Sequence, residues 1–265
     1  MELKISYFII LLIILYFLIN KKNIKNIINI NNLGSIENFV STINFKISNI
    51  YVINLDREKN KMRNLYNEMM KNNYKYERFS AVDGKKLKEN DYRIKKYFGK
   101  TKNYSMGQKC CTLSHIAIWN KILENKTQYN IILEDDVIIP EKLYSNVNKY
   151  LEQLPGDWDF LFLGGNRIIG HKYSENLLVP PKKKVNGNYG TFAYLINSKN
   201  IKNILDKCYN ILEHTDTFIQ RTLSKDFNIF FCNPQVIKHN YDTVSSIRNK
   251  NRKNEEKRNN YITVL

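Results

Sequence analysis

Apolar and polar residues alternate in blocks along the chain, and the lengths and spacing of the blocks predict strands and helices in turn. Short apolar runs with the length of buried strands occur at 50–55, 76–82, 131–139, 158–163, 191–197 and 229–232. Apolar residues at helical spacing occur at about 58–71, 108–124, 141–153, 198–208 and 217–224. Helices alternating with apolar strands predict a layered α/β domain with a mostly parallel mixed sheet flanked by helices.

The first apolar stretch, residues 5–19, precedes this pattern. At about 1.5 Å per residue it spans roughly 22 Å, somewhat less than the hydrocarbon core of a bilayer. Lysine and asparagine follow it directly, without a small-residue cleavage pattern, so we expect an uncleaved single-pass membrane anchor within residues 1–20. More lysines follow the stretch than precede it, which favours a cytoplasmic main domain; a domain in a Golgi-like lumen stays open.

Composition predicts the domain limits. Residues 21–48 are rich in asparagine, isoleucine and lysine without clear periodicity, and we interpret them as a stalk. Residues 49–245 carry the alternating strands and helices and form the predicted folded domain. Residues 246–265 form a mainly basic tail, which is typical of solvated surface.

The composition restricts the class of protein. Of the 265 residues, 43% are hydrophobic and 12% aromatic, which indicates a folded globule and not a disordered chain. The net charge of +17 suits a phosphate-bearing partner, but the charge is scattered and no nucleic-acid recognition motif accompanies it. The four cysteines lack the spacing of a zinc site and are predicted to be core thiols.

Three consecutive carboxylates, Glu134, Asp135 and Asp136, interrupt the apolar run 131–139. Buried carboxylates are costly unless they meet water, a cation or a metal ion. Strand geometry would direct Glu134 and Asp136 to one side and Asp135 to the other, an arrangement that suits Mg²⁺ or Mn²⁺. A solvated turn at the end of the strand is the alternative interpretation.

Polar residues follow two other predicted strands. Asn54, Asp56 and Arg57 follow the first strand and Asp83 the second. Because ligands bind outside the carboxyl ends of strands in open α/β sheets, we expect these residues and the carboxylates to share one rim. There, Asn54, Asp56 and Arg57 could bind a nucleotide base, ribose or phosphate. Alternatively, Asp56 caps the following helix and Arg57 forms a surface ion pair.

Six short segments keep a characteristic order and spacing. The stronger ones are 51–57 (YVINLDR), 79–84 (FSAVDG), 113–115 (LSH) and 131–137 (IILEDDV); the weaker ones are 157–164 (DWDFLFLG) and 190–196 (GTFAYLI). Together they resemble glycosyltransferase family 25, the family of lipooligosaccharide and collagen galactosyltransferases. The resemblance covers roughly residues 50–240.

The resemblance implies a nucleotide-sugar-binding domain of GT-A type, a UDP-sugar donor, usually UDP-galactose, a Mn²⁺ or Mg²⁺ ion, and inversion at the anomeric carbon. It implies that Glu134 and Asp136 are metal ligands and that His239 is a late metal ligand. Asp135 would contact the donor ribose or sugar. The remaining donor contacts would come from the rim residues Asn54, Asp56, Arg57 and Asp83.

An inverting transfer needs a base for the acceptor hydroxyl. The resemblance makes Asp216 the candidate, although it could equally be a helix N-cap. Ser114 and His115 would contact the acceptor or a loop. His115 also lies on an apolar helix stripe, so a core histidine is an alternative.

The expected acceptor is a hydroxyl of a glycan, a lipid-linked saccharide or a protein. Two other functions stay open: a metal-dependent nucleotidyltransferase, and a catalytically inactive, membrane-anchored sugar-nucleotide-binding protein. Gln108 and Cys110 suggest the second, because the family usually has an acidic residue and a glycine at these positions.

Overall fold

The computed structural model of the chain describes residues 47–99, 104–183, 185–243 and 261–265. The predicted anchor, nearly all of the predicted stalk and most of the predicted tail lie outside these ranges. Within the described residues, no helix has both the length and the apolar character needed to cross a bilayer. The anchor over residues 5–19, its orientation and the domain limits therefore stay predictions.

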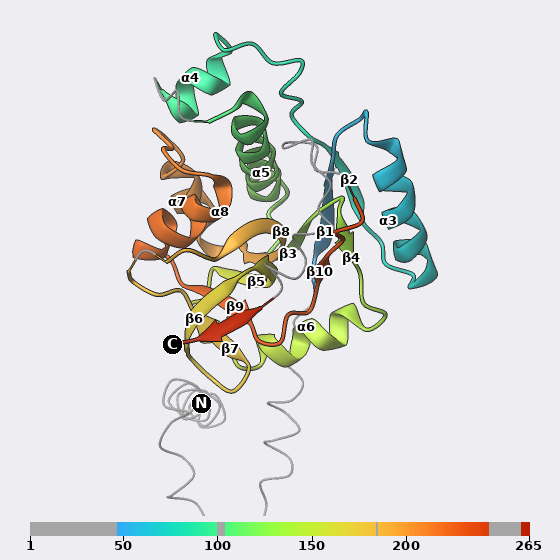
Figure 1. Cartoon of the computed structure of the whole chain (residues 1–265), viewed down its shortest axis with the longest axis vertical. Coiled ribbons are helices and arrows are strands. Elements are labelled where there is room, and N and C mark those ends of the chain that lie inside the picture. Colours follow the sequence, from blue (N-terminus) through green and yellow to red (C-terminus); the bar gives the residue numbers. More distant parts are fainter. Residues whose placement is uncertain (1–46, 100–103, 184, 244–260) are drawn as a thin grey trace, which may run out of the picture. The chain divides into compact units, whose positions relative to one another are not determined.

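A nine-stranded sheet in the order β11-β6-β7-β9-β5-β8-β3-β1-β2 organises the described residues, with a separate pair β10-β4 (Figure 1). The strands are β1 (Asn49–Asn54), β2 (Glu77–Ser80), β3 (Tyr129–Glu134), β4 (Val137–Ile138), β5 (Phe160–Asn166), β6 (Ile168–Lys172), β7 (Leu177–Val179), β8 (Tyr189–Asn197), β9 (Ile229–Cys232), β10 (Lys238–His239) and β11 (Ile262–Val264).

The sheet is mixed, as predicted, but its parallel strand pairs do not outnumber the antiparallel ones. Strand pairs β1–β2, β1–β3, β5–β9 and β6–β11 are parallel. Pairs β3–β8, β5–β8, β6–β7 and β7–β9 are antiparallel. The cause is β8, which lies antiparallel between β3 and β5, together with the turn-connected β6 and β7. An apolar run has the same length and composition in either direction, so the sequence pattern could not reveal this.

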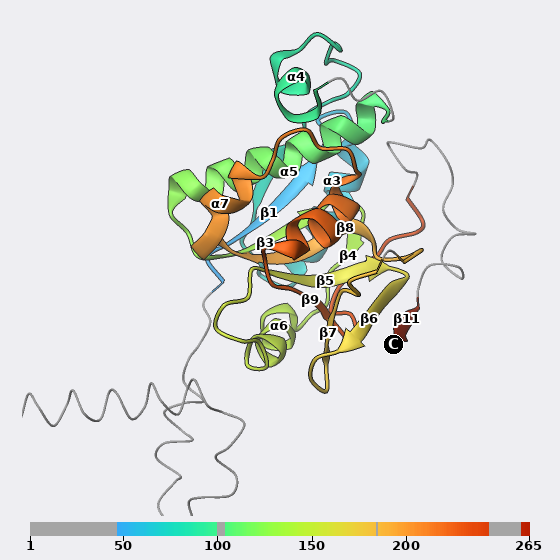
Figure 2. The same ribbon diagram turned by 90° about the vertical axis from the view of Figure 1, so that its left-hand side faces the viewer.

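Helices cover both faces of the sheet. The α-helices are α3 (Lys59–Lys71), α4 (Tyr92–Phe98), α5 (Met106–Asn125), α6 (Leu143–Leu151), α7 (Ile201–Asp206) and α8 (Thr215–Thr217). Short 3₁₀ segments are η2 (Ser198–Asn200) and η4 (Leu223–Lys225), and η3 (Phe218–Thr222) is a π-turn. Helices α5, α7 and α8 lie on one face and α3 and α6 on the other, while α4 lies near one end of α5 (Figures 1 and 2).

Side chains of the central strands point alternately to the two faces of the sheet and so contribute to two hydrophobic cores. In β1, Tyr51 and Ile53 pack in the core beneath α5, while Ile50 and Val52 pack in the core beneath α3. Strand β3 divides its residues between the two cores in the same way. A strand buried on both faces needs an almost continuous apolar run, which explains why these segments could be predicted from sequence.

Two predicted elements differ from the structure. The apolar run 131–139 is not one strand, because β3 ends at Glu134 and the chain bends before β4. The predicted helix 217–224 is a mixture of α, π and 3₁₀ turns that begins at Thr215. Thr217, Ile219 and Thr222 are β-branched, and such side chains lose rotamer freedom in a regular helix.

Candidate functional site

A cleft of about 290 Å³ opens at the carboxyl ends of β1, β2 and β3, beside the first turns of α5. Its lining residues come from four chain segments: Ile53, Leu55, Arg57, Lys61, Ala81, Val82, Gly84, Lys85, Ser105, Gly107, Cys111, Ser114, His115, Glu134, Asp135 and Asp136. The prediction that three strand ends share one rim is therefore confirmed. Parallel pairing of β1 with both β2 and β3 brings these ends together.

The three carboxylates line the same cleft but face different neighbours. Strand alternation stops where β3 ends, because Asp135 and Asp136 lie in a bend. Glu134 contacts residues of α5 and β8, Asp135 contacts β1 and α3, and Asp136 contacts β10. Each carboxylate therefore has its own surroundings, and the predicted common face of Glu134 and Asp136 stays a prediction.

Asp135 lies between an amide and an ammonium group. Its Oδ2 accepts a hydrogen bond from Nδ2 of Asn54 at 2.6 Å, and Lys61 Nζ lies 3.7 Å from its Oδ1. Burial, followed by the charge of Asp136, raises the pKa of Asp135 to about 7, although Lys61 and Asn54 oppose this shift. These contacts hold Asp135 at the cleft wall, where it could accept hydrogen bonds from a ligand.

Asp136 pairs with His239. The ladder between β4 and β10 places His239 opposite Val137, and His239 Nε2 lies 3.4 Å from Asp136 Oδ2. Both side chains are buried. Two ligands bonded at about 2.1 Å to adjacent positions of one ion lie roughly 3.0–3.4 Å apart, so this carboxylate and imidazole fit a divalent cation.

Glu134 lies in a third group with His115 and Cys111. Its Oε1 accepts a hydrogen bond from Oγ1 of Thr191 at 3.1 Å and lies 3.8 Å from His115 Nε2. The ligand atoms of Cys111, His115 and Glu134 lie within 4.8 Å of one another, so this group is also a candidate cation site. Burial and the nearby Glu134 charge raise the pKa of the Cys111 thiol well above its usual range.

His115 belongs both to the core and to the cleft. Its side chain is fully buried, and its Nδ1 lies 2.9 Å from the hydroxyl of Tyr194. Its Nε2 faces Glu134, and the residue lines the cleft. The two interpretations made from the sequence are therefore compatible.

Ser114 is placed at the cleft but its hydroxyl is engaged within the protein. The hydroxyl accepts from the backbone N–H of Val82 at 2.9 Å and donates to the carbonyl of Cys110 at 2.8 Å. These bonds tie α5 to the segment after β2. A contact of this hydroxyl with an acceptor would have to replace one of them.

Helix capping by Asp56 is contradicted. Residue Glu58 occupies the cap of α3, without a side-chain hydrogen bond. The Asp56 carboxylate instead accepts from Arg78 at 2.6 Å and from Ser80 at 2.9 Å, and hydrogen bonds from these two residues lower its pKa. Arg57 makes its ion pair with Asp83, which joins the ends of β1 and β2.

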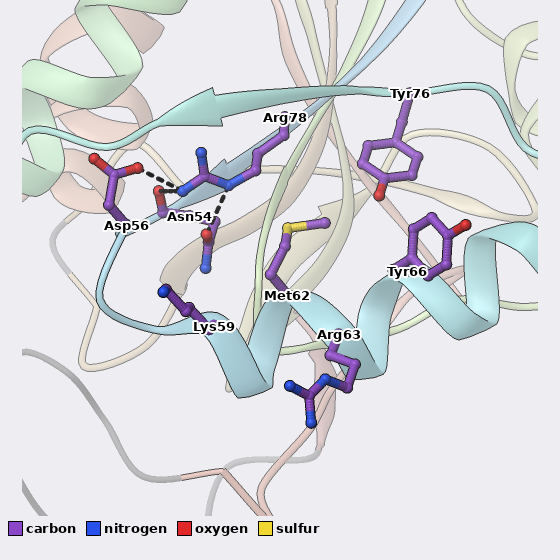
Figure 3. Close-up of a pocket in the computed structure, with 8 residues that line it drawn as sticks. All are labelled: Asn54, Asp56, Lys59, Met62, Arg63, Tyr66, Tyr76 and Arg78. Atoms are coloured by element: carbon purple, nitrogen blue, oxygen red, sulfur yellow. Dashed lines mark hydrogen bonds and ion pairs between the residues drawn. The ribbon is translucent and has the colours of Figure 1, made fainter.

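Asp56 lines a second pocket, of about 470 Å³, between α3 and β2 (Figure 3). Figure 3 shows Arg78 reaching both Asp56 and Asn54 on its floor. Asn54 thus joins the two pockets, because its Oδ1 accepts from Arg78 at 2.9 Å while its Nδ2 donates to Asp135. The structure therefore separates Asp56 from the cleft and links Asn54 to it.

Asp216 is not a helix N-cap, since His214 holds that position and Asp216 lies in the first turn of α8. Its carboxylate accepts hydrogen bonds from the backbone N–H of Gly190 at 2.8 Å and of Thr217 at 2.7 Å. Asp216 does not line the cleft itself. It connects to the cleft through β8, where Thr191 follows Gly190 and contacts Glu134.

Gln108 has a structural role. It forms a capping box with Ser105 at the start of α5: Gln108 Oε1 accepts from the Ser105 N–H at 2.8 Å, and Ser105 Oγ accepts from the Gln108 N–H at 3.4 Å. Glutamine and glutamate both serve at this position of a capping box. A departure from an acidic residue at Gln108 therefore keeps the helix start intact.

Sequence reasoning missed several site residues. Four residues from distant parts of the sequence contact the predicted site residues, and no local motif indicates these contacts: Lys61, Arg78, Thr191 and Tyr194. Cys111 could have been found, because it precedes His115 by one helical turn and therefore lies on the same helix face.

Comparison with known proteins agrees with this architecture. The sequence model of "Glycosyltransferase family 25 (LPS biosynthesis protein)" matches residues 47–219 of the 265. The match covers more than half of the chain, and the chain belongs to this family. The resemblance found in its motifs is confirmed.

The similar proteins are larger. A "Glycosyltransferase 25 family member" of Aedes aegypti is 28% identical over 173 residues, which cover 61% of this chain and 28% of the relative. "Procollagen galactosyltransferase 1" of Danio rerio is 23% identical over 168 residues, which cover 59% of this chain and 28% of the relative. The matched region thus spans little more than a quarter of these relatives.

Among solved structures, similarity is weak. A glycosyltransferase involved in the glycosylation of the major capsid of PBCV-1 aligns with a TM-score of 0.40 and 9% identity, over 69% of this chain and 79% of that chain. Similarity at this level carries no argument about function.

Proposed function

We propose that this chain is a GT-A type, divalent-cation-dependent glycosyltransferase that transfers a sugar from a UDP-sugar to a hydroxyl of a glycan, a lipid-linked saccharide or a protein, with inversion. Galactose from UDP-galactose is the first donor to test, since a relative carries the name procollagen galactosyltransferase. The observation that carries the proposal is the Asp136–His239 pair, at 3.4 Å, beside the cleft where the ends of β1, β2 and β3 meet.

Asp136 and His239 would hold Mn²⁺ or Mg²⁺. When bound, the cation supplies charge stabilisation for the departing nucleoside diphosphate. Glu134 faces His115 and is not one of the two proposed cation ligands. The two ligands from the protein leave the other positions of the cation for phosphate oxygens and water, as is usual for Mg²⁺ sites.

The nucleoside would lie on the side of the cleft formed by Arg57, the segment after β2 and Asp135. Arg57, held by Asp83, presents a guanidinium group suited to phosphate or ribose oxygens. Asp135, fixed by Asn54 and Lys61, would accept hydrogen bonds from ribose or sugar hydroxyls. Single charged groups held by a second residue in this way are positioned before the ligand arrives.

Asp216 is proposed as the base that takes the proton of the acceptor hydroxyl. Two backbone N–H groups fix its carboxylate, from Gly190 in β8 and Thr217 in α8. Inversion requires the base on the face of the sugar opposite the leaving diphosphate. Asp216 is linked to the carboxylates of the cleft through β8, because it accepts from Gly190 and the next residue, Thr191, donates to Glu134.

A donor screen tests this function. The purified full chain is incubated with UDP-galactose, UDP-glucose and UDP-N-acetylglucosamine, with Mn²⁺ or with a chelator, and released UDP is measured. We expect Mn²⁺-dependent UDP release with at least one donor. Pyrophosphate release from a nucleoside triphosphate would instead indicate a nucleotidyltransferase, and donor binding without turnover would indicate an inactive binding protein.

A further inference from the structure

Three buried side chains determine where the protons around His115 lie. The Tyr194 hydroxyl accepts a hydrogen bond from Nε1 of Trp119 at 3.0 Å and lies 2.9 Å from Nδ1 of His115. All three side chains are fully buried. An indole N–H can only donate, so the phenol oxygen must be the acceptor in its contact with Trp119.

The phenol proton then has one acceptor. Among the described residues, Nδ1 of His115 is the only partner left for the Tyr194 hydroxyl. If Nδ1 carried a proton, both neighbours would donate to Tyr194, and its own proton would be buried without an acceptor at a cost of about 1–3 kcal/mol. Burial raises the pKa of Tyr194 well above its usual range, so the phenol keeps its proton.

It follows that Tyr194 donates to Nδ1 and that His115 carries its own proton on Nε2. This proton has no partner within the described part of the chain, because Nε2 makes no hydrogen bond there. The nearest acceptor, Glu134 Oε1, is 3.8 Å away, which is too long for a direct hydrogen bond. A donor and an acceptor thus face each other across a gap in the cleft wall.

The 3.8 Å between the two atoms is too short for an oxygen on the line that joins them, but an oxygen displaced to the side of that line could lie about 2.8 Å from each of them. Such an oxygen must accept from His115 Nε2–H and donate to Glu134 Oε1 at the same time, which a hydroxyl can do and a carbonyl or phosphate oxygen cannot. Both residues line the cleft, but Nε2 of His115 exposes less than 1 Å² of surface, so a hydroxyl would reach it only when the two side chains move apart.

The same proton disfavours a metal ion among Cys111, His115 and Glu134. An imidazole ligand needs a free lone pair on the bonding nitrogen and usually donates its other N–H to an oxygen. Here the nitrogen that faces Glu134 carries the proton. The clustering of the three side chains is therefore better explained by binding of a hydroxyl than by a cation.

We propose that His115 Nε2–H and Glu134 Oε1 together bind one hydroxyl of the transferred sugar and so select the donor. This inference rests on the proposed function. Glu134 is two residues from Asp136 and accepts from Thr191, whose chain neighbour Gly190 donates to Asp216, so the gap is near both the proposed cation ligand and the proposed base. Tyr194 acts through His115 as a positioning residue, because it holds the ring in the tautomer that donates.

Deoxy donors test the proposal. The full chain is assayed with the active donor of the screen, UDP-galactose in the first instance, and with analogues that lack single hydroxyls. Sites built to hydrogen-bond a hydroxyl discriminate strongly against its loss, so we expect one analogue to lose about 100-fold or more in kcat/KM. In Glu134→Leu, whose side chain has no acceptor, the same analogue should lose no more than about fivefold relative to its parent donor.

Tyr194→Phe removes one hydroxyl and should lower kcat/KM for the parent donor about tenfold while weakening the discrimination against that analogue. Tyr150→Phe is the matched control, since its hydroxyl bonds the Pro234 carbonyl away from the cleft, and it should leave both quantities unchanged. Equal discrimination in the wild type and in Glu134→Leu would overturn the proposal.

A measurement without turnover separates this proposal from the proposed function. In ¹⁵N spectra of the full chain labelled at histidine, His115 should show a protonated Nε2 and an unprotonated Nδ1, and Tyr194→Phe should change this pattern. A protonated Nδ1 overturns the inference. So does a sulfur-to-cobalt absorption band that appears on adding Co²⁺ and is absent in Cys111→Ser. No UDP release from any donor would contradict the proposed function while leaving the proton assignment measurable.

Discussion

Two ends of the same sheet bury carboxylates, and they do so differently. Asp159, just before β5, is 2% exposed, and its oxygens accept from the Asn200 amide and the Asn228 backbone N–H, both at 2.8 Å. At the opposite end, Asp136 is 4% exposed and faces His239, while Asp135 faces Lys61. The first carboxylate is surrounded by neutral donors, the others by groups that can carry charge.

The difference separates a structural carboxylate from a functional one. Neutral amides satisfy Asp159 within the protein, and it lines neither of the two pockets described above. Glu134, Asp135 and Asp136 all line the cleft, with a titratable or cationic neighbour for each. Burial alone therefore does not mark a site; burial next to a cleft with partners suited to ligands does.

Replacing Asp136 should give the largest effect. Asp136→Asn removes the charge that would hold the cation but keeps the shape, so we expect UDP release to fall about 10²- to 10³-fold with little change in thermal stability. Asp159→Asn is the matched control at the other end of the sheet and should retain its activity per folded molecule. If both variants lost activity equally, the two regions would not differ as described.

Replacing Asp159 should show the reverse pattern. Asp159→Ala leaves the Asn228 N–H and the Asn200 amide without their acceptor, which should lower the free energy of unfolding by about 1–3 kcal/mol. Urea unfolding measures this loss, and UDP release normalised to folded protein should not change. An active-site defect with unchanged stability would contradict the structural role of Asp159.

The pH dependence of stability should give a smaller effect. Burial raises the pKa of Asp159 above 3.8, although the hydrogen bonds from Asn200 and Asn228 oppose the shift. The folded state then binds this proton more tightly than the unfolded state, so the contribution is present at low pH and is lost as pH rises through the folded pKa. In Asp159→Asn, the free energy of unfolding should fall less steeply with pH above pH 3.8 than in the wild type. An equally steep fall in both proteins would contradict a raised pKa of Asp159.

Much of the sheet could be predicted from sequence because its central strands are buried on both faces and read as continuous apolar runs, as in 50–55 and 191–197. The rim at Arg57 and Glu134–Asp136 could also be predicted, since polar residues directly follow those strands. Strand direction could not be predicted, because the antiparallel placement of β8 leaves no trace in the apolar pattern.

The surroundings of each carboxylate could not be predicted from the sequence either. Alternation predicted one face for Glu134 and Asp136, but it could not predict that the strand ends at Glu134 and that the two carboxylates have different partners. The partners Lys61, Thr191 and Tyr194 come from distant segments, and their contacts depend on packing. The order of the motifs in the sequence was enough to locate the site, but the contacts of each carboxylate could be found only in the structure.

The most direct test of the central claim is the dependence of UDP release on Mn²⁺ concentration in the wild type and in His239→Gln. Loss of an outer-shell partner of a metal ligand typically weakens metal affinity about 10- to 100-fold, so loss of a ligand should raise the half-maximal Mn²⁺ concentration by at least that factor. His171→Gln, at an exposed position of β6, is the matched control and should match the wild type. UDP release that persists in a chelator, or an equal Mn²⁺ requirement in all three proteins, would contradict a cation held by Asp136 and His239.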